Sequence, residues 1–292
     1  MAVPWRIGPA QAQLQSAWQC LQKKYSVCQI TSPATRVNGE PREGGLEDLR
    51  MGSDDRYNPC TTDGMDREDG CPGYFGHIEL ATPLYHIGFN RTVLKVLRCV
   101  GFHTSKLLLN PNNEKDAATL AMLRKTLMGP ARLERAMAAC ATKKSDWSGG
   151  SAQPKFKMDP EKHIGIKAEW PAQKNQDEAM EEGAEEARVE REQLLSGRVV
   201  HEILRNITDE DCLLLGFDPR YCRPDWMMIK VLPVPPPAVR PAIEMDSTGR
   251  AEDDLTHQYA QIVKDNNALR AHMASGSPEH VLKARIAVAL CD

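Results

Sequence analysis

Apolar residues recur at helical spacing in three parts of the chain. Residues 90–102, "NRTVLKVLRCVGF", place four apolar side chains on one helical face: Val93, Leu94, Leu97 and Val100. Leucines at similar spacing predict a helical stretch over residues 114–141. The segment "SGRVVHEIL" predicts a helix that begins after Ser196, because a serine side chain can cap the first free backbone N–H groups.

The last quarter of the chain predicts a strand followed by a helical hairpin. Residues 225–236, "DWMMIKVLPVPP", alternate as a strand does and stop at a proline cluster. A helix is expected from residue 253, with Leu255, Ile262 and Leu269 at heptad spacing and facing inward. "SGSP" then ends this helix, and the short helix that follows would make the hairpin a truncated one.

Turn-forming and charged residues dominate the segments between these elements. A short helical pattern at residues 10–25 leads into a loop rich in glycine, proline and charge, and residues 51–77 are rich in turn residues. Residues 176–193 carry eight acidic residues and two arginines. They predict a solvated linker or an exposed helix rather than an acidic docking surface.

Composition adds limits rather than a function. The chain is 41% hydrophobic and 26% charged, with a net charge of −3, so any surface for nucleic acid has to be a local patch. Its nine cysteines are irregularly spaced, and the N-terminus does not have the pattern of a secretory signal. No apolar run reaches the roughly 18 to 20 residues that span a bilayer. We therefore expect a soluble chain in a reducing compartment, with no membrane partner.

Three longer stretches carry a resemblance to a known family. They are "CPGYFGHIELATPLYHIGFNRTVLKVLRC", "RPDWMMIKVLPVPPPAVRPAI" and "EDDLTHQYAQIVKDNNALR". In this order and rough spacing they resemble the N-terminal clamp region of the largest subunit of multisubunit RNA polymerases. The eukaryotic RNA polymerase II version is the most similar, and the archaeal version comes next. The resemblance covers most of residues 38–292 and weakens between residues 110 and 195.

The resemblance implies an α+β fold with helices, a small mixed sheet and irregular loops. It also implies a division into five parts. Residues 1–50 would form an N-terminal segment, and residues 51–110 a degenerate zinc loop with a core helix. Residues 111–195 would form a divergent helical and acidic insert. Residues 196–250 would form a core strand with a proline connector, and residues 251–292 a truncated clamp-head hairpin.

The function that the resemblance implies is that of a component of a nuclear DNA-directed RNA polymerase. Such a clamp encloses template DNA and the RNA–DNA hybrid, assembles with other subunits, especially the second-largest, and docks initiation and elongation factors at its hairpin. The aspartate-rich motif that holds catalytic Mg²⁺ does not occur in these 292 residues, so we do not expect this segment alone to be catalytic. A truncated paralogue that binds factors, or a non-functional remnant, is the alternative.

The family's first zinc site is only half preserved. The resemblance places Tyr57, Cys60, Cys71 and Tyr74 at its four ligand positions, so two of the four can bind zinc. His77 could serve as a third ligand. Further candidates are remote or offer hard oxygen atoms: Cys28, Asp63 and Asp66. We expect at most one zinc ion in this chain. The favoured alternative is that this site binds no zinc, with Cys60 and Cys71 as free thiols and with Tyr57 and Tyr74 packing the loop.

The family's second zinc site has lost its ligands. Its positions fall at Gly101 and Thr104 and near Ser148 and Ser151, none of which is a suitable zinc ligand. Cysteine and histidine side chains nearby could in principle bind a metal, but buried thiols and a satisfied histidine are the more ordinary interpretation. These are Cys99, His103 and Cys140.

Five basic residues are candidates for contact with DNA phosphates: Arg91, Lys95, Arg98, Lys106 and Arg270. Four of them follow the zinc-like loop, and Arg270 lies on the predicted hairpin. Contacts of this kind depend on salt and not on base sequence. Ordinary surface charge or structural ion pairing is the alternative for each residue.

Overall fold

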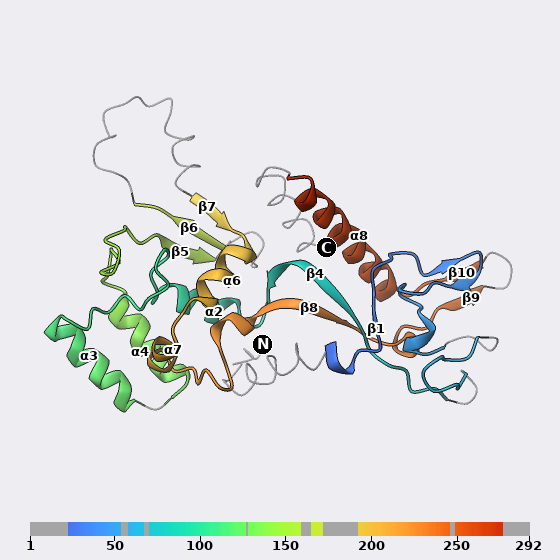
Figure 1. Ribbon diagram of the computed structural model, residues 1–292, viewed down its shortest axis with the longest axis horizontal. Helices are drawn as coiled ribbons and strands as arrows, with labels where there is room; N and C mark the ends of the chain where they lie inside the picture. The colour runs from blue at the N-terminus through green and yellow to red at the C-terminus, as the bar shows by residue number, and fades with distance from the viewer. Residues whose placement is uncertain are drawn as a thin grey trace, which may run out of the picture. The chain divides into compact units, whose positions relative to one another are not determined.

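The structure is a computed structural model in which the chain forms two compact units (Figure 1). Unit 1 contains Met1–Ala17 and Pro83–Ile229, and unit 2 contains Trp18–Thr82 and Lys230–Asp292. The structure describes residues 23–53, 58–66, 70–126, 128–158, 165–171, 192–245 and 249–276. Tyr57, most of the predicted N-terminal helix and the second arm of the hairpin lie outside these residues.

The helices of unit 1 begin and end where the local sequence favours it. Ser196 caps one helix by accepting a hydrogen bond from the Val199 N–H, and Thr208 caps another through the Asp211 N–H. Gly216 ends the second of these helices with φ at 95°, a conformation that glycine adopts without strain. The five helices described in this unit are α2 (Asn90–Leu97), α3 (Glu114–Lys125), α4 (Pro130–Cys140), α6 (Gly197–Arg205) and α7 (Asp209–Leu215).

The sequence predictions for these helices are confirmed except in two places. The four apolar positions predicted to share one helical face are all buried, namely Val93, Leu94, Leu97 and Val100, but α2 ends at Leu97 and Val100 lies beyond it in a β-bridge with Leu107. The stretch 114–141 forms two helices, because Pro130 occupies the first turn of α4, where its missing N–H costs nothing.

A three-stranded antiparallel sheet completes unit 1. Its strands are β5 (Lys155–Met158), β6 (Ile166–Glu169) and β7 (Glu192–Leu195). Phe156 pairs with Ala168, and Ile166 pairs with Leu195, so one face of the sheet is apolar and buried. The end of the acidic segment therefore differs from the prediction, because residues 192 and 193 begin a strand.

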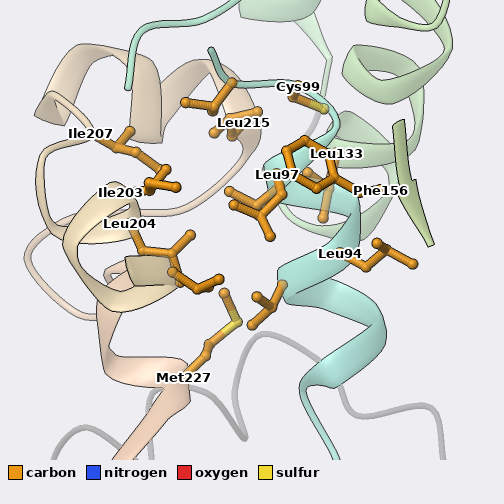
Figure 2. Packing of buried hydrophobic residues seen from close by; sticks show 14 of the residues in the cluster. Leu94, Leu97, Cys99, Leu133, Phe156, Ile203, Leu204, Ile207, Leu215 and Met227 are labelled. Atoms are coloured by element: carbon orange, nitrogen blue, oxygen red, sulfur yellow. The ribbon is translucent and has the colours of Figure 1, made fainter. Parts of the chain in front are cut away.

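The core of unit 1 lies between its helices and the buried face of this sheet (Figure 2). Leu97 of α2 and Leu204 of α6 are almost completely buried, and Phe156 reaches the same cluster from β5. Burial of a side chain of this size stabilises a fold by roughly 1.5 to 3 kcal/mol. Contacts between residues far apart in sequence thus hold the unit together.

Unit 2 is organised by a sheet with strand order β1-β4-β8. These strands are β1 (Cys28–Gln29), β4 (Gly76–Tyr85) and β8 (Met228–Val234), and the boundary between the units falls within β4 and β8. The predicted strand before the proline cluster is confirmed as β8. Unit 2 also contains four short strands: β2 (Arg36–Val37), β3 (Glu40–Pro41), β9 (Ile243–Met245) and β10 (Gly249–Ala251). Its 3₁₀ turns are η1 (Leu49–Met51) and η4 (Pro237–Val239). A further 3₁₀ turn, η3 (Pro224–Met227), belongs to unit 1.

Helix α8 (Asp254–Ala274) packs on unit 2 through a face that differs from the predicted one. Leu269 is buried as expected, but Leu255 is 49% exposed, so the prediction that it faces inward is wrong. The other buried positions are Thr256, Ala260, Val263 and Asn266, and Ile262 packs against the apolar cluster that contains Ala260 and Val263. This face therefore meets an apolar core and, through Asn266, the polar backbone of a strand edge.

Asn266 makes that contact. Its Oδ1 accepts a hydrogen bond from the Ala81 N–H at 2.7 Å, and its Nδ2 donates to the Glu79 carbonyl at 2.8 Å. The β1 segment occupies the same edge of β4 only as far as Ile30, whose N–H donates to the His77 carbonyl. The amide of Asn266 therefore continues the pairing of β4 beyond the end of β1. The α+β class is confirmed, and the five-part division stays a prediction.

Candidate functional site

The cysteine loop of unit 2 brings Cys60, Asp63 and Cys71 together. One sulfur or carboxylate oxygen from each lies within 4.8 Å of the others, and this is the one such group of three among the described residues. A tight turn positions the first two, since the Gly64 N–H donates to the Cys60 carbonyl at 2.8 Å. Gly64 has φ at 75°, which favours glycine at this turn. The two predicted thiols therefore meet across the loop.

Asp63 is the polar centre of this cluster. Its Oδ1 accepts the Met65 N–H at 3.0 Å, and its Oδ2 accepts the Cys71 thiol at 3.1 Å and the Tyr74 hydroxyl at 3.3 Å. The Met65 N–H and then the Cys71 thiol lower the pKa of Asp63. Burial and the neighbouring Asp63 raise the pKa of the Cys71 thiol. The loop is thus held by hydrogen bonds to a carboxylate.

The cluster supplies three of the four ligands that a structural zinc ion takes, and no fourth joins it among the described residues. Zinc accepts thiolate sulfur and carboxylate oxygen, and Cys60 and Cys71 would supply the former and Asp63 the latter. Because the Cys71 thiol is protonated at neutral pH, zinc would have to displace its proton. Asp63 follows Cys60 by three residues, the spacing of a short ligand pair, and this spacing is a sequence signal for it.

His77 lies outside this cluster, in the strand that follows the cysteine loop. It is part of β4, and its Nδ1 is 2.7 Å from the Ser26 hydroxyl oxygen. Burial lowers the pKa of His77, so the ring is neutral at pH 7. The described cluster contains Asp63 and not His77, and a role for His77 as a metal ligand stays a prediction.

The residues near the second predicted zinc site do not assemble a metal cluster within the described part of the chain. A hydrogen bond with Cys140 and burial raise the pKa of the Cys99 thiol, which makes it an inert core side chain. The Cys140 thiol lies 3.8 Å from the Cys99 carbonyl. The exposed His103 stacks on Trp170, with ring centroids 5.9 Å apart.

Four of the candidate DNA-binding residues lie in unit 1. Lys95 is 3.2 Å from the Glu134 carboxylate, and Lys106 donates to the Ser148 hydroxyl. Arg98 donates to a backbone carbonyl of β5 at 2.9 Å. These three side chains have structural contacts, although all but Lys95 are exposed.

Arg91 differs from the other candidates. It is exposed at the start of α2, and no ion-pair or hydrogen-bond partner is found for it in the described part of the chain. Arg270, on α8 in unit 2, donates to the Glu79 carbonyl beside Asn266. Of the five candidates, Arg91 is therefore the one whose positive charge has no partner among the described residues.

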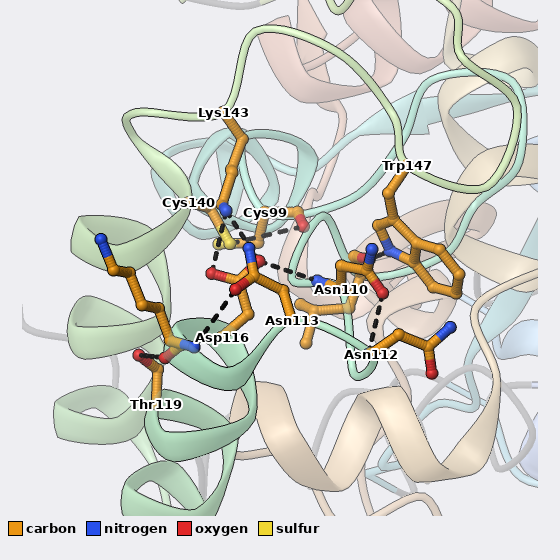
Figure 3. Close-up of polar contacts among 11 residues, drawn as sticks. Cys99, Asn110, Asn112, Asn113, Asp116, Thr119, Cys140, Lys143 and Trp147 are labelled. Carbon is orange, nitrogen blue, oxygen red and sulfur yellow. Dashed lines mark hydrogen bonds and ion pairs between the residues drawn. The ribbon is translucent and has the colours of Figure 1, made fainter.

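A polar network that sequence reasoning did not find connects α3 to the turn after α4 (Figure 3). Lys143 donates to both carboxylate oxygens of Asp116, at 2.9 and 2.7 Å, and Asp116 also accepts the Asn110 N–H. This hydrogen bonding with Lys143 lowers the pKa of Asp116. The network is structural, since it joins α3 to the turn after α4.

Comparison with known proteins identifies the family. Residues 11–288 match the family described as RNA polymerase Rpb1, domain 1. The chain belongs to this family. DNA-directed RNA polymerase II subunit RPB1 of Euplotoides octocarinatus is 38% identical to it over 263 residues, which cover 86% of this chain and 52% of that relative. The chain thus spans about half the length of the relative and corresponds to the N-terminal region of an RNA polymerase II-like largest subunit.

Membership of the Rpb1 family agrees with the architecture. The mixed helices and small sheets fit an α+β Rpb1 domain 1. No helix among the described residues is both long and apolar enough to cross a membrane. In this Rpb1 domain the cysteine loop brings two thiols together with a carboxylate, three groups that could hold a metal ion.

Proposed function

We propose that this chain is the N-terminal clamp part of the largest subunit of a nuclear DNA-directed RNA polymerase II. The observation that carries the proposal is the match of residues 11–288 to Rpb1 domain 1. In this role the chain assembles with the second-largest and other subunits and encloses template DNA and the RNA–DNA hybrid. The nucleotidyl transfer itself belongs to aspartates outside these 292 residues.

The clamp contributes to transcription by holding nucleic acid and not by reacting with it. Positive side chains near the phosphates retain DNA through a salt-dependent interaction that does not read base sequence. Arg91 is the first candidate for such a contact, because it is exposed and has no ion-pair or hydrogen-bond partner among the described residues. Lys95, Arg98 and Lys106 lie on α2 or shortly after it and would have to share their present partners with a phosphate.

The cysteine loop would bind one zinc ion through Cys60, Asp63 and Cys71. The ion would supply a cross-link between the two halves of the loop, where hydrogen bonds to Asp63 already join them. Cys60 is 1% exposed, so the ion would be partly shielded from water on that side. Its role in this chain would be structural.

Helix α8 is the proposed docking element for initiation and elongation factors. It is anchored to β4 through Asn266 and Arg270, while Leu255 near its start is 49% exposed. The fixed helix leaves its remaining surface for a partner. This proposal concerns the segment 251–292, of which residues 251–276 are described.

The assignment is tested by purifying the complex through a tag on the full-length gene product. We expect the second-largest subunit to co-purify and the complex to synthesise RNA on a DNA template. Purification of the chain without other polymerase subunits would refute the proposal and favour a factor-binding paralogue or a remnant.

A matched pair of variants tests the phosphate contact in that complex. Arg91→Ala should weaken DNA binding and reduce the slope of log K against log salt by about 1, the loss of one phosphate contact. Arg220→Ala is the control, because Arg220 is also exposed in unit 1 but is paired with Asp218. Equal effects of the two substitutions would remove Arg91 from the proposed DNA path.

A further inference from the structure

Two short hairpins in unit 1 lie against one another. Hairpin A comprises residues 99–108 and has a bridge between Val100 and Leu107, with the Gly101 N–H donating to the Lys106 carbonyl at 2.8 Å. Hairpin B comprises residues 144–153 and has a bridge between Ser145 and Ala152. These are the segments in which the family resemblance expects the ligands of a second zinc ion.

Asp146 of hairpin B is the centre of their contact. Its side chain is 2% exposed, and its Oδ2 accepts a hydrogen bond from the Thr104 hydroxyl of hairpin A. Its Oδ1 accepts the Ser148 N–H at 3.0 Å within hairpin B. Both carboxylate oxygens are therefore engaged, one in each hairpin.

Gly101 leaves the room that the carboxylate occupies. A Cβ at this position would lie 2.5 Å from Asp146 Oδ2 and 2.6 Å from the Thr104 hydroxyl oxygen, which is closer than atoms of these kinds approach. The absence of a side chain at 101 is thus a condition for the contact between Asp146 and Thr104.

Further side chains join the hairpins beside Asp146. Gln153 of hairpin B accepts the Phe102 N–H at 3.1 Å through Oε1 and donates to the Val100 carbonyl at 2.8 Å through Nε2. Trp147 donates from its indole nitrogen to the Leu107 carbonyl at 2.9 Å. Each of these bonds satisfies a backbone group of hairpin A that would otherwise lack a partner in this contact.

A zinc ion does not fit this arrangement. Thr104 and Ser148 offer neutral hydroxyls, which are not the thiolate, imidazole or carboxylate ligands that zinc takes in structural sites. One carboxylate alone does not make a four-ligand set.

We propose that hairpins A and B form a metal-free cross-link in which the buried Asp146 carboxylate, with Thr104 and the space at Gly101, takes the structural role of a metal ion. Gln153 and Trp147 complete the cross-link. Hairpin pairing in this chain therefore depends on hydrogen bonds to side chains and is independent of zinc.

Hydrogen–deuterium exchange of the full chain tests this inference. Asp146→Asn removes the charge and turns one acceptor into a donor, so amide exchange in both hairpins should rise by about tenfold or more, as local opening becomes easier. Incubation of the unchanged chain with a zinc chelator should alter exchange there by less than about twofold, an order-of-magnitude bound for local stability that does not depend on a ligand. Asp225→Asn is the control, because Asp225 is also buried in unit 1 but pairs with Arg223.

A milder pair of variants at Thr104 keeps the test decisive if Asp146→Asn fails to fold. Thr104→Val removes the hydroxyl at constant shape and should raise exchange in both hairpins, whereas Thr104→Ser keeps the hydroxyl and should restore protection. The proposal is overturned if the chelator opens the hairpins of the unchanged chain. It is equally overturned if Thr104→Val leaves their exchange at the level of Thr104→Ser.

Discussion

The attachment of α8 to the edge of β4 gives a quantitative test of the structure. Asn266→Ala removes the acceptor of the Ala81 N–H and one of the two donors to the Glu79 carbonyl, while Arg270 still donates to that carbonyl. Asn266 is 8% exposed, so water does not readily replace its amide. The substitution thus leaves one backbone N–H without a partner beside a helix.

The magnitude follows from these two bonds. An unsatisfied buried donor costs about 1 to 3 kcal/mol, and loss of a further hydrogen bond costs about 0.5 to 1.5 kcal/mol. We expect Asn266→Ala to lower the free energy of unfolding of unit 2 by about 1.5 to 4.5 kcal/mol. The neighbouring Asn267 provides a matched control, because its Nδ2 donates to the Thr31 carbonyl at an exposed position. Asn267→Ala should cost less than about 1 kcal/mol.

Urea denaturation of the full chain, followed by hydrogen exchange at residues 76–82 and 254–274, measures both variants. Exchange assigns the loss of stability to β4 and α8 and not to unit 1. If Asn266→Ala destabilises these segments no more than Asn267→Ala does, the amide does not extend the strand pairing and the reasoning is wrong.

Three further predictions concern the metal loop, a buried carboxylate and the core. Cys71→Ser should reduce bound zinc to a trace in metal analysis, and an unchanged zinc content would contradict the loop assignment. We expect no more than one equivalent in the unchanged chain, and two equivalents would contradict that limit. Burial raises the pKa of Asp48, but hydrogen bonds from the Arg50 side chain and from the backbone N–H groups of Gly44 and Arg50 outweigh it and lower the pKa. Asp48 therefore stabilises the fold above its unfolded pKa of about 4. The stability difference between the unchanged chain and Asp48→Asn should be full at pH 6 and shrink as the pH falls below about 4, and a difference that is constant with pH would refute this. Leu204→Ala should destabilise unit 1 by about 2 to 5 kcal/mol in urea denaturation, because it opens a cavity in a core where Leu204 is 0% exposed.

Local signals in the sequence predicted the elements whose conformation depends on near neighbours. The apolar spacing in α2, the serine before α6 and the proline after β8 each act within a few residues, and each prediction is confirmed. The family also followed from sequence, because its motifs are long and ordered. The meeting of the two thiols Cys60 and Cys71 in one loop was also expected from the sequence.

The errors arose where a side chain meets a distant part of the chain. Leu255 fits a heptad pattern, but the buried face of α8 places Ala260 and Val263 against the apolar core of unit 2 and Asn266 against the edge of β4. Asp63 has the right spacing from Cys60, yet only the folded loop shows that its carboxylate reaches Cys71. Sequence periodicity reports which residues are apolar and does not report which surface they will meet.

The sequence by itself determined the family and the α+β class, and it predicted which zinc-ligand positions are substituted. The tertiary structure decided which side chains meet at those positions: Asp63 lies beside the two thiols, and Asp146 bonds Thr104 across 42 positions of sequence. The physical reason is that a metal ligand or a hydrogen-bond acceptor is defined by its distance to a partner. For residues far apart in the chain, that distance is set by the packing of the whole unit and not by local conformation.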